Sequence, residues 1–180
     1  MPDERSESFL EDKRVAILAK GLGEKSRVAD WTGVRTVAQI NELVKGDAVI
    51  AAMEKHAIDS AVGSKGKDSS DLFYELVDPE IKRTTGITDV RSAEYFQELQ
   101  RAQEVRLRVV ELRQLVLEGQ IDSAKTTEEL AQALAQAPEL EAYIKNSDDM
   151  EAISGSMVRY SDSLSLVRAF KEKRGELVRA

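Results

Sequence analysis

The stretch QRAQEVRLRVVELRQLVLEGQ, from Gln100 to Gln120, combines a regular apolar pattern with a regular charge pattern. Its main apolar residues follow spacings of 3, 4, 3 and 4, which places them on one face of a helix. These residues are Ala102, Val105, Val109, Leu112 and Val116. Further aliphatic residues beside them widen the face beyond the narrow seam of a two-stranded coiled coil. The stretch therefore predicts a long amphipathic helix over about residues 92–118.

Charged residues line both sides of this apolar face. Glu104, Glu111 and Glu118 recur every seven residues, and arginines stand at positions 101, 106, 108 and 113. Because Glu104 and Arg108 have the favourable i to i+4 spacing, acidic neighbours on the same helix can neutralise the arginines. We therefore interpret the arginines as the ordinary charged flank of a packed helix. The alternative is that they hold an anion or an acidic partner.

A second stretch near the end of the sequence repeats the apolar spacing. It contains Met150, Ile153, Met157, Tyr160, Leu164 and Val167, at spacings of 3, 4, 3, 4 and 3. This pattern predicts a second long amphipathic helix over about residues 148–174. We expect the two long helices to pack as a helical hairpin, with two short helices between them that break before Pro138. The apolar seams can pair within one chain or between two copies.

Shorter helices are expected before the first long helix. The first is predicted over Ser8–Lys20, with Leu10, Ile17 and Leu18 toward the core. It should end at Gly21 and Gly23, because glycine favours the left-handed turns that close helices. Further helices are expected over Val37–Val44 and Asp47–Val62, and Pro79 can open another that ends near Gly86. The fold class predicted from these patterns is all-α, a multihelical bundle.

Helix-start signals and composition suggest how the chain is divided. Three residue pairs match the capping box: Ser8 with Glu11, Thr36 with Gln39, and Asp148 with Glu151. The polar stretch GSKGKDSSD, residues 63–71, is expected to be a linker. It separates an N-terminal region of short helices, residues 1–62, from a long-helix bundle, residues 72–180. The alternative is that all of these residues form one cooperative domain.

The composition argues against several classes of function. The 180 residues include 26 Lys and Arg against 33 Asp and Glu, a net charge of −7, and neither half of the chain is basic. Proteins that coat nucleic acid need many clustered cations, so such a role is disfavoured. There is no cysteine, and His56 is the only histidine, which rules out thiolate sites and metal sites built from several histidines. We predict a protein that is not an enzyme and carries no metal or cofactor.

The sequence also leads to an expectation about location. The first residues, MPDERSESFLEDKR, are acidic and lack the apolar segment of a secretory signal. The longest apolar run, Ala48–Met53, is far shorter than the roughly 20 residues that cross a bilayer. We expect no membrane association and a cytoplasmic location. Leaderless export and incorporation into a larger assembly are the alternatives.

These patterns favour an assembly or adaptor protein that binds copies of itself or another protein through amphipathic helices. Two seams combined with little catalytic chemistry motivate this hypothesis, and we expect a homo-oligomer. The residues predicted to form the packing or interface surface are Val105, Val109, Leu112, Val116, Met157, Tyr160, Leu164 and Val167.

The alternative function is sequence-independent binding or packaging of nucleic acid. The segments TGVRTV from Thr32 and TGITDV from Thr85 resemble the turn of helix-hairpin-helix domains over six residues, with one glycine where that family has two. The resemblance implies that amides in these turns contact phosphate, with help from nearby cations and the basic C-terminal tail. The predicted anion contacts are Arg35, Lys45, Lys82, Arg83, Arg91, Lys171, Lys173 and Arg174.

Overall fold

The computed structural model describes residues 2–62, 68–145, 159–160 and 163–180. All regular secondary structure in this part of the chain is α-helical, which confirms the predicted all-α multihelical fold. The helices are α1 (Pro2–Lys25), α2 (Val37–Lys45), α3 (Ala48–Val62), α4 (Ser69–Leu76), α5 (Asp78–Thr85), α6 (Ala93–Ser123), α7 (Thr127–Ala135), α8 (Pro138–Lys145) and α10 (Ser163–Arg179).

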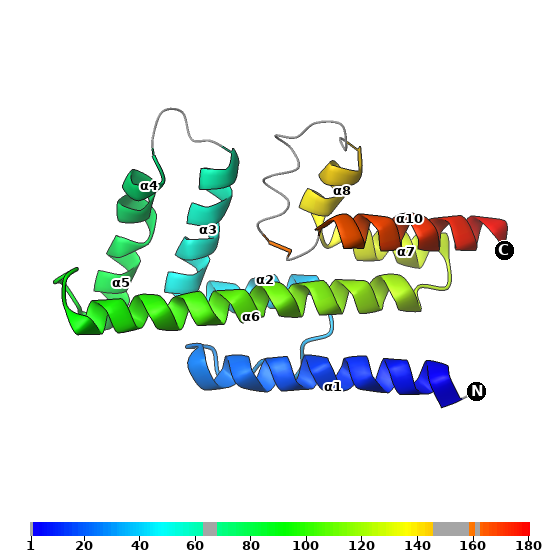
Figure 1. Ribbon diagram of the computed structural model, residues 1–180, viewed down its shortest axis with the longest axis horizontal. Helices are drawn as coiled ribbons and strands as arrows, with labels where there is room; N and C mark the ends of the chain where they lie inside the picture. The colour runs from blue at the N-terminus through cyan, green and yellow to red at the C-terminus, as the bar shows by residue number, and fades with distance from the viewer. Residues whose placement is uncertain (1, 63–67, 146–158, 161–162) are drawn as a thin grey trace.

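The long helix α6 forms the axis of the molecule (Figure 1). Helix α1 lies along one side of α6, α2 and α3 pack on another, and α7 and α10 cover its C-terminal half. Helices α4 and α5 stand beside α3 near the start of α6. The two ends of α6 therefore carry different sets of helices, and this separation matters for the surfaces described below.

Helix α6 follows the prediction closely at its start. The Ser92 hydroxyl caps the helix by accepting a hydrogen bond from the Tyr95 amide at 3.2 Å. The helix continues to Ser123, five residues beyond the predicted end at 118, because Ile121 extends the buried face. Its core face includes all the predicted seam residues of this helix: Ala102, Val105, Val109, Leu112 and Val116.

The glycines that were predicted to end the first helix lie inside α1, which runs on to Lys25. A Cβ at Gly21 would lie 2.5 Å from Arg108 Nη1 on α6, and one at Gly23 would lie 2.9 Å from the carbonyl oxygen of Ala29. Both glycines therefore mark places where another part of the chain comes close to α1. Close packing, rather than a left-handed turn, explains their presence.

Other details of the predicted first helix are also wrong. Ser8 lies within α1, so its pairing with Glu11 does not start the helix. Ile17 is 68% exposed, although Leu18 packs against the core as expected. The side chain of Leu10 lies outside the described residues. Ile17 and Leu18 are adjacent, so one helix cannot direct both toward the same neighbour.

The helix-start signal at Thr36 is confirmed in full. Its hydroxyl accepts from the Gln39 amide at 3.2 Å, and Gln39 Oε1 accepts from the Thr36 amide at 3.1 Å. This reciprocal pair is the capping box. Helices α2 and α3 match the predicted spans Val37–Val44 and Asp47–Val62 to within a residue.

The predicted linker is shorter than expected. Asp68 caps α4 by accepting from the Asp71 amide at 2.8 Å, so residues 69–71 belong to a helix and residues 63–67 lie outside the described part. Pro79 stands in the first turn of α5, and that helix ends at Gly86 as predicted, with Gly86 in the left-handed conformation at φ +75°. The hydrophobic core contains residues from both sides of this linker.

The C-terminal region differs from the predicted second long helix. Helices α7 and α8 occur where two short helices were expected, and α8 begins at Pro138. Helix α10 starts only at Ser163, and Arg159 and Tyr160 are not helical, so a single helix over 148–174 is wrong. Met150, Ile153, Met157 and the predicted cap Asp148 with Glu151 lie outside the described residues. Helix α10 packs on α6, as the predicted hairpin required.

Candidate functional site

Most predicted interface residues pack inside their own chain. Val105, Val109, Leu112 and Val116 on α6 are at most 6% exposed, and they join Tyr160 and Val167 in one hydrophobic cluster. Met157 lies outside the described residues. Leu164 differs from the rest of the set, because it is 58% exposed. The first seam is therefore used within the chain, and Leu164 is the described member that faces solvent.

The exposure of Leu164 follows from where α10 begins. Because Tyr160 precedes the helix, the spacing from Tyr160 to Leu164 does not keep both residues on one helical face. The buried face of α10 consists instead of Ser163, Leu166, Val167 and Phe170. Leu164 points away from this face.

Arg113 is the largest departure from the predicted charged flank. It is fully buried, and its guanidinium pairs with Glu54 of α3 through Nη1–Oε1 at 2.5 Å and Nη2–Oε2 at 2.8 Å. Arg113 Nε also donates to Asn41 Oδ1 of α2 at 3.0 Å, and Arg159 donates to the same oxygen. The bidentate pair joins α6 to α3, and the hydrogen bond to Asn41 adds α2. Its acidic partner comes from another helix, not from α6.

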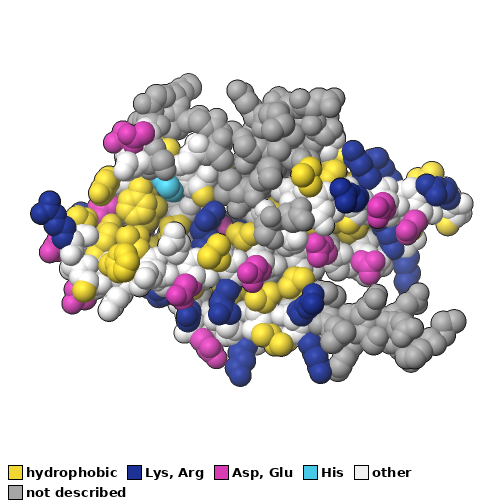
Figure 2. All heavy atoms as spheres, in the orientation of Figure 1, with side chains coloured by type: hydrophobic (Ala, Val, Ile, Leu, Met, Phe, Trp, Pro, Cys, Tyr) yellow, Lys and Arg dark blue, Asp and Glu magenta, His cyan; other side chains and the backbone are white. Residues whose placement is uncertain are grey.

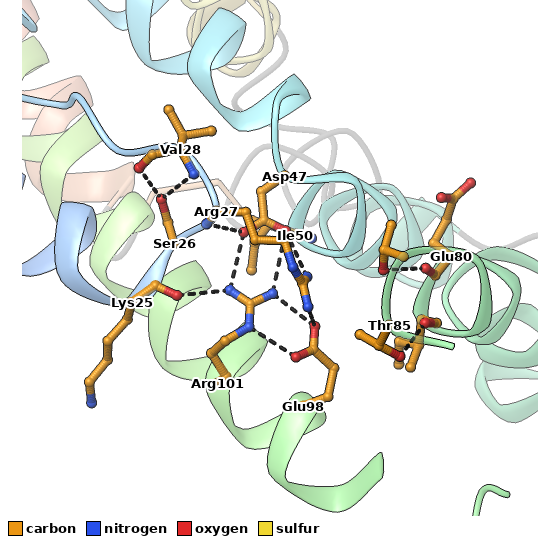
Figure 3. Close-up of polar contacts among 12 residues, drawn as sticks. Lys25, Ser26, Arg27, Val28, Asp47, Ile50, Glu80, Thr85, Glu98 and Arg101 are labelled. Carbon is orange, nitrogen blue, oxygen red and sulfur yellow. Dashed lines mark hydrogen bonds and ion pairs between the residues drawn. The ribbon is translucent and has the colours of Figure 1, made fainter. Parts of the chain in front are cut away.

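A second ionic cluster joins the segment after α1 to α3 and α6 (Figure 3). Arg101 of α6 donates through Nη1 to Asp47 Oδ2 at 3.1 Å and through Nη2 to Glu98 Oε1 at 2.9 Å. Arg27 Nη2 lies 2.6 Å from the same Glu98 oxygen. Arg101 also donates to the carbonyl oxygen of Lys25 at the end of α1. Two arginines and two carboxylates thus hold three helices in register.

The charges in this cluster shift one another's pKa values. Burial alone raises the pKa of Asp47, but hydrogen bonds from Arg101 and from the Arg27 amide outweigh burial and hold that pKa below its usual range. Glu98 behaves in the same way, with Arg101 and Arg27 lowering its pKa against the effect of burial. Both carboxylates are therefore ionised at neutral pH, and the cluster is a structural element with its charges satisfied.

Four of the predicted anion contacts before α6 are engaged within the chain. Lys45 pairs with Glu42 at 2.7 Å, Lys82 with Asp78 at 2.9 Å, and Arg83 with Glu80 at 2.7 Å. Arg35 donates to the carbonyl oxygen of Val34 at 2.8 Å. Within the described part of the chain, no side-chain contact engages Arg91, which is exposed. The structure does not bring these cations into one surface with the C-terminal tail.

Helix α10 carries the remaining predicted cations. Lys173 donates to the carbonyl oxygen of Asp122 at 2.7 Å, which anchors α10 to the end of α6. Arg174 stands over the Phe170 ring with its Cζ 5.6 Å from the ring centroid. Lys171 and the neighbouring Arg168 are exposed, and neither forms an ion pair within the described residues.

The outer face of α10 is both basic and apolar. Leu164, Arg168, Lys171, Arg174 and Val178 follow spacings of 4, 3, 3 and 4, so they form one strip along the helix, which we call the basic stripe. Leu164 is 58% and Val178 72% exposed. At about 1.5 Å per residue, these two apolar ends lie about 21 Å apart. Dark blue side chains mark this helix in Figure 2.

Aromatic side chains gather at the other end of the molecule. Tyr74 of α4 is 57% exposed, Phe96 of α6 is 60% exposed, and Val90 precedes α6 at 41%. Figure 2 shows hydrophobic side chains over α4 and the start of α6, next to the single histidine. We call Tyr74, Val90 and Phe96 the aromatic patch. The apolar spacing of the sequence does not single out Tyr74 or Val90, whereas Phe96 is part of the apolar stretch that extends the predicted face of α6 toward its start.

The residues next to the aromatic patch are held in place by buried contacts. Tyr95, next to Phe96, is buried and donates its hydroxyl to Asp78 Oδ1 at 2.6 Å. Burial and this hydrogen bond raise the pKa of Tyr95 far above its usual range. The Phe73 ring meets those of His56 and Tyr74 edge-on, at centroid distances of 5.8 and 5.9 Å. The exposed rings therefore sit on fixed backbone rather than on a loose end.

The described part of the chain contains no group of three or more His, Asp or Glu side chains arranged to hold a metal ion. A hollow beside α2 has a volume of about 440 Å³ and is lined by Asp30, Val34, Gln39, Leu43 and neighbours. No nucleophile and base face each other there. Among the described helices, none is both long enough and apolar enough to span a bilayer.

Comparison with protein-family models, with curated proteins and with solved structures found no match to this chain. The basic stripe and the aromatic patch are therefore the two surfaces that bear on function.

Proposed function

We propose that this protein is a cytoplasmic, non-enzymatic assembly protein that associates with copies of itself through exposed helix faces. The observation that carries the proposal is the exposure of large apolar side chains at both ends of α6. Tyr74 and Phe96 stand at one end, and Leu164 and Val178 stand on the helix that covers the other. Each is more than half exposed.

Isolated exposed apolar residues are common and need no explanation, but exposed aromatic rings on rigid helices favour protein contacts. Full burial of one such side chain is worth about 1.5–3 kcal/mol. Four of them offer about 6–12 kcal/mol before the cost of association is subtracted. The remainder corresponds to a weak interface, with a dissociation constant of about 1 µM or above. This estimate favours reversible assembly over a permanent dimer.

The proposal is tested by absolute mass in solution. Size exclusion with light scattering, from about 1 µM to about 300 µM, covers the affinity range of weak interfaces. We expect the average mass to rise from the 20.0 kDa of one chain toward multiples of it as concentration increases. A mass that stays at one chain throughout this range would contradict self-association.

Nucleic-acid binding is the competing function, and it is favoured by one observation: Arg168 and Lys171 of α10 have no ion-pair partner among the described residues. Against it, Lys45, Lys82 and Arg83 already have acidic partners. A fluorescent single-stranded oligonucleotide titrated at low salt distinguishes the two functions. We expect no binding near micromolar concentration, whereas tight binding that weakens steeply with salt would favour the competing function.

A further inference from the structure

We propose that the protein assembles head to tail, with the basic stripe of one copy bound to the aromatic patch of the next. This inference rests on the proposed function and adds to it which surfaces meet. It commits to a second copy of the chain as the partner of both surfaces. Three features of the molecule support it: the charges of the two surfaces, the pairing of their charged side chains, and the positions of the surfaces.

The two surfaces have opposite charge. Residues 68–97, which contain the aromatic patch, include seven acidic and three basic residues, a net charge of −4. Helix α10 includes five basic and two acidic residues, a net charge of +3. The protein as a whole is acidic, with a net charge of −7, so the positive face of α10 stands apart from the rest. Complementary charge steers association and sets its orientation.

The acidic groups near the aromatic patch also support binding of the patch to the basic stripe. On α5, the cations Lys82 and Arg83 are held by Asp78 and Glu80, so they do not cancel the remaining acids at this end of the molecule. Asp71 and Glu94 are exposed beside the patch, in the first turns of α4 and α6.

The stripe contains two cations for which the described part of the chain supplies no ion pair. Within the described residues, Arg168 and Lys171 have no carboxylate in ion-pair range. The two acidic residues of α10, Glu172 and Glu176, lie to one side of the stripe at helical spacing, so they do not interrupt it. An acidic surface is therefore the natural partner for this face.

The basic stripe and the aromatic patch are also complementary in their apolar side chains. The stripe ends in Leu164 and Val178, and the patch presents Tyr74 and Phe96. Contact between the two surfaces would bury aliphatic side chains against aromatic rings. It would also bring lysine and arginine side chains to exposed ring faces, where cation–π attraction adds about 0.5–1 kcal/mol per contact.

The positions of the two surfaces exclude pairing within one chain. Helix α4 stands near the start of α6, and α10 covers its far half (Figure 1). Each copy therefore presents one stripe and one patch to different neighbours. Such a heterologous contact gives rings where the rotation closes and open chains where it does not. A dimer that paired the stripe of one copy with the stripe of another would be opposed by their like charges.

The experiment uses two variants that each lack one surface. The stripe variant carries Leu164→Ser with Lys171→Glu, and the patch variant carries Tyr74→Ser with Phe96→Ser. A matched control carries Leu107→Ser with Lys20→Glu, which removes an exposed leucine and reverses an exposed lysine away from both surfaces. Circular dichroism melting confirms that each variant is folded, which is expected because every substituted side chain is exposed.

Head-to-tail assembly predicts a specific result on mixing. Each variant alone should stay at the mass of one chain at concentrations where the wild type and the control associate. An equimolar mixture should form dimers of twice 20.0 kDa and nothing larger, because one intact stripe meets one intact patch. Raising the salt should weaken the dimer at least severalfold, since charge contributes to it.

Other outcomes overturn the inference, and they are distinguishable from failure of the proposed function. If the wild type associates but either variant alone associates equally well, the surfaces are wrong while assembly stands. If both variants are monomeric and the mixture also stays monomeric, the two surfaces do not bind each other. If the wild type itself is a monomer throughout, the proposed self-association fails together with the inference.

Discussion

Removing Glu54 should destabilise the protein strongly, because its partner is a fully buried arginine. In Glu54→Ala, the Arg113 guanidinium loses hydrogen bonds of 2.5 and 2.8 Å and keeps only its 3.0 Å bond to Asn41. Breaking a buried ion pair from one side costs about 3–5 kcal/mol, because an uncompensated charge stays buried. For a chain of this length, that loss corresponds to a fall in melting temperature of about 10 °C.

The assay is urea unfolding followed by circular dichroism, with a matched control on the neighbouring helix. Glu42→Ala removes the partner of Lys45 in an ion pair whose side chains are more than 70% exposed. An exposed pair contributes about 0–1 kcal/mol, so this control should unfold close to the wild type. If Glu54→Ala also lost less than about 1 kcal/mol, Arg113 would not be buried as described.

A double variant distinguishes the contribution of charge from that of packing at the Glu54–Arg113 pair. In Glu54→Leu with Arg113→Met, both charges are removed and apolar volume is kept. Replacing a whole buried ion pair by apolar residues is often neutral or stabilising. We expect recovery of most of the stability lost in Glu54→Ala. A double variant as unstable as the single one would show that the shape of these side chains, rather than their charge, supports the core.

Three smaller predictions follow from other contacts. Gly21→Ala should be neutral or slightly stabilising, because only the flexible tip of an arginine must move. Gly23→Ala should cost about 1–3 kcal/mol of stability, because its Cβ would meet a backbone oxygen at 2.9 Å. The melting temperatures of the two variants test this difference. Tyr95→Phe should cost about 1–2 kcal/mol in urea unfolding, because Asp78 loses a buried hydrogen bond. Asp47 has a folded-state pKa below its usual value of about 3.9, so its contribution is present above that pH and is lost as the pH falls through the folded pKa. Asp47→Asn should therefore lower the free energy of unfolding by about 2 kcal/mol at pH 7. The difference in unfolding free energy from the wild type should shrink as the pH falls below about 4. A difference that does not depend on pH would contradict this prediction.

The parts of the fold that the sequence predicted depend on local chemistry. The capping box at Thr36 and Gln39, the helix end at Gly86 and the break before Pro138 each need only nearby residues. The core face of α6 also follows from spacing alone, since burying that face in any partner satisfies the pattern. These features were predictable because their physical causes lie within one or two turns of chain.

The parts that were missed depend on tertiary contacts. Gly21 and Gly23 were interpreted as a helix end, but they lie inside α1, where Arg108 and Ala29 come too close for a larger side chain to fit without a shift. Arg113 was assigned to a charged flank, although it lies between Val109 and Val116 on the apolar face of α6. That position, together with Glu54 directly after the longest apolar run, was the available signal of a buried pair.

Exposure, rather than periodicity, indicates where this protein can bind another. A heptad spacing shows which face of a helix must be covered, but a chain with several helices can cover it internally, as α6 does here. The apolar residues free for assembly are then those left outside the internal packing, and Phe96 and Leu164 belong to this group. Leu164 fits the spacing in the sequence yet faces solvent, because α10 begins after Tyr160. Its exposure moves the predicted interface from the buried seam to the exposed side of the same helix.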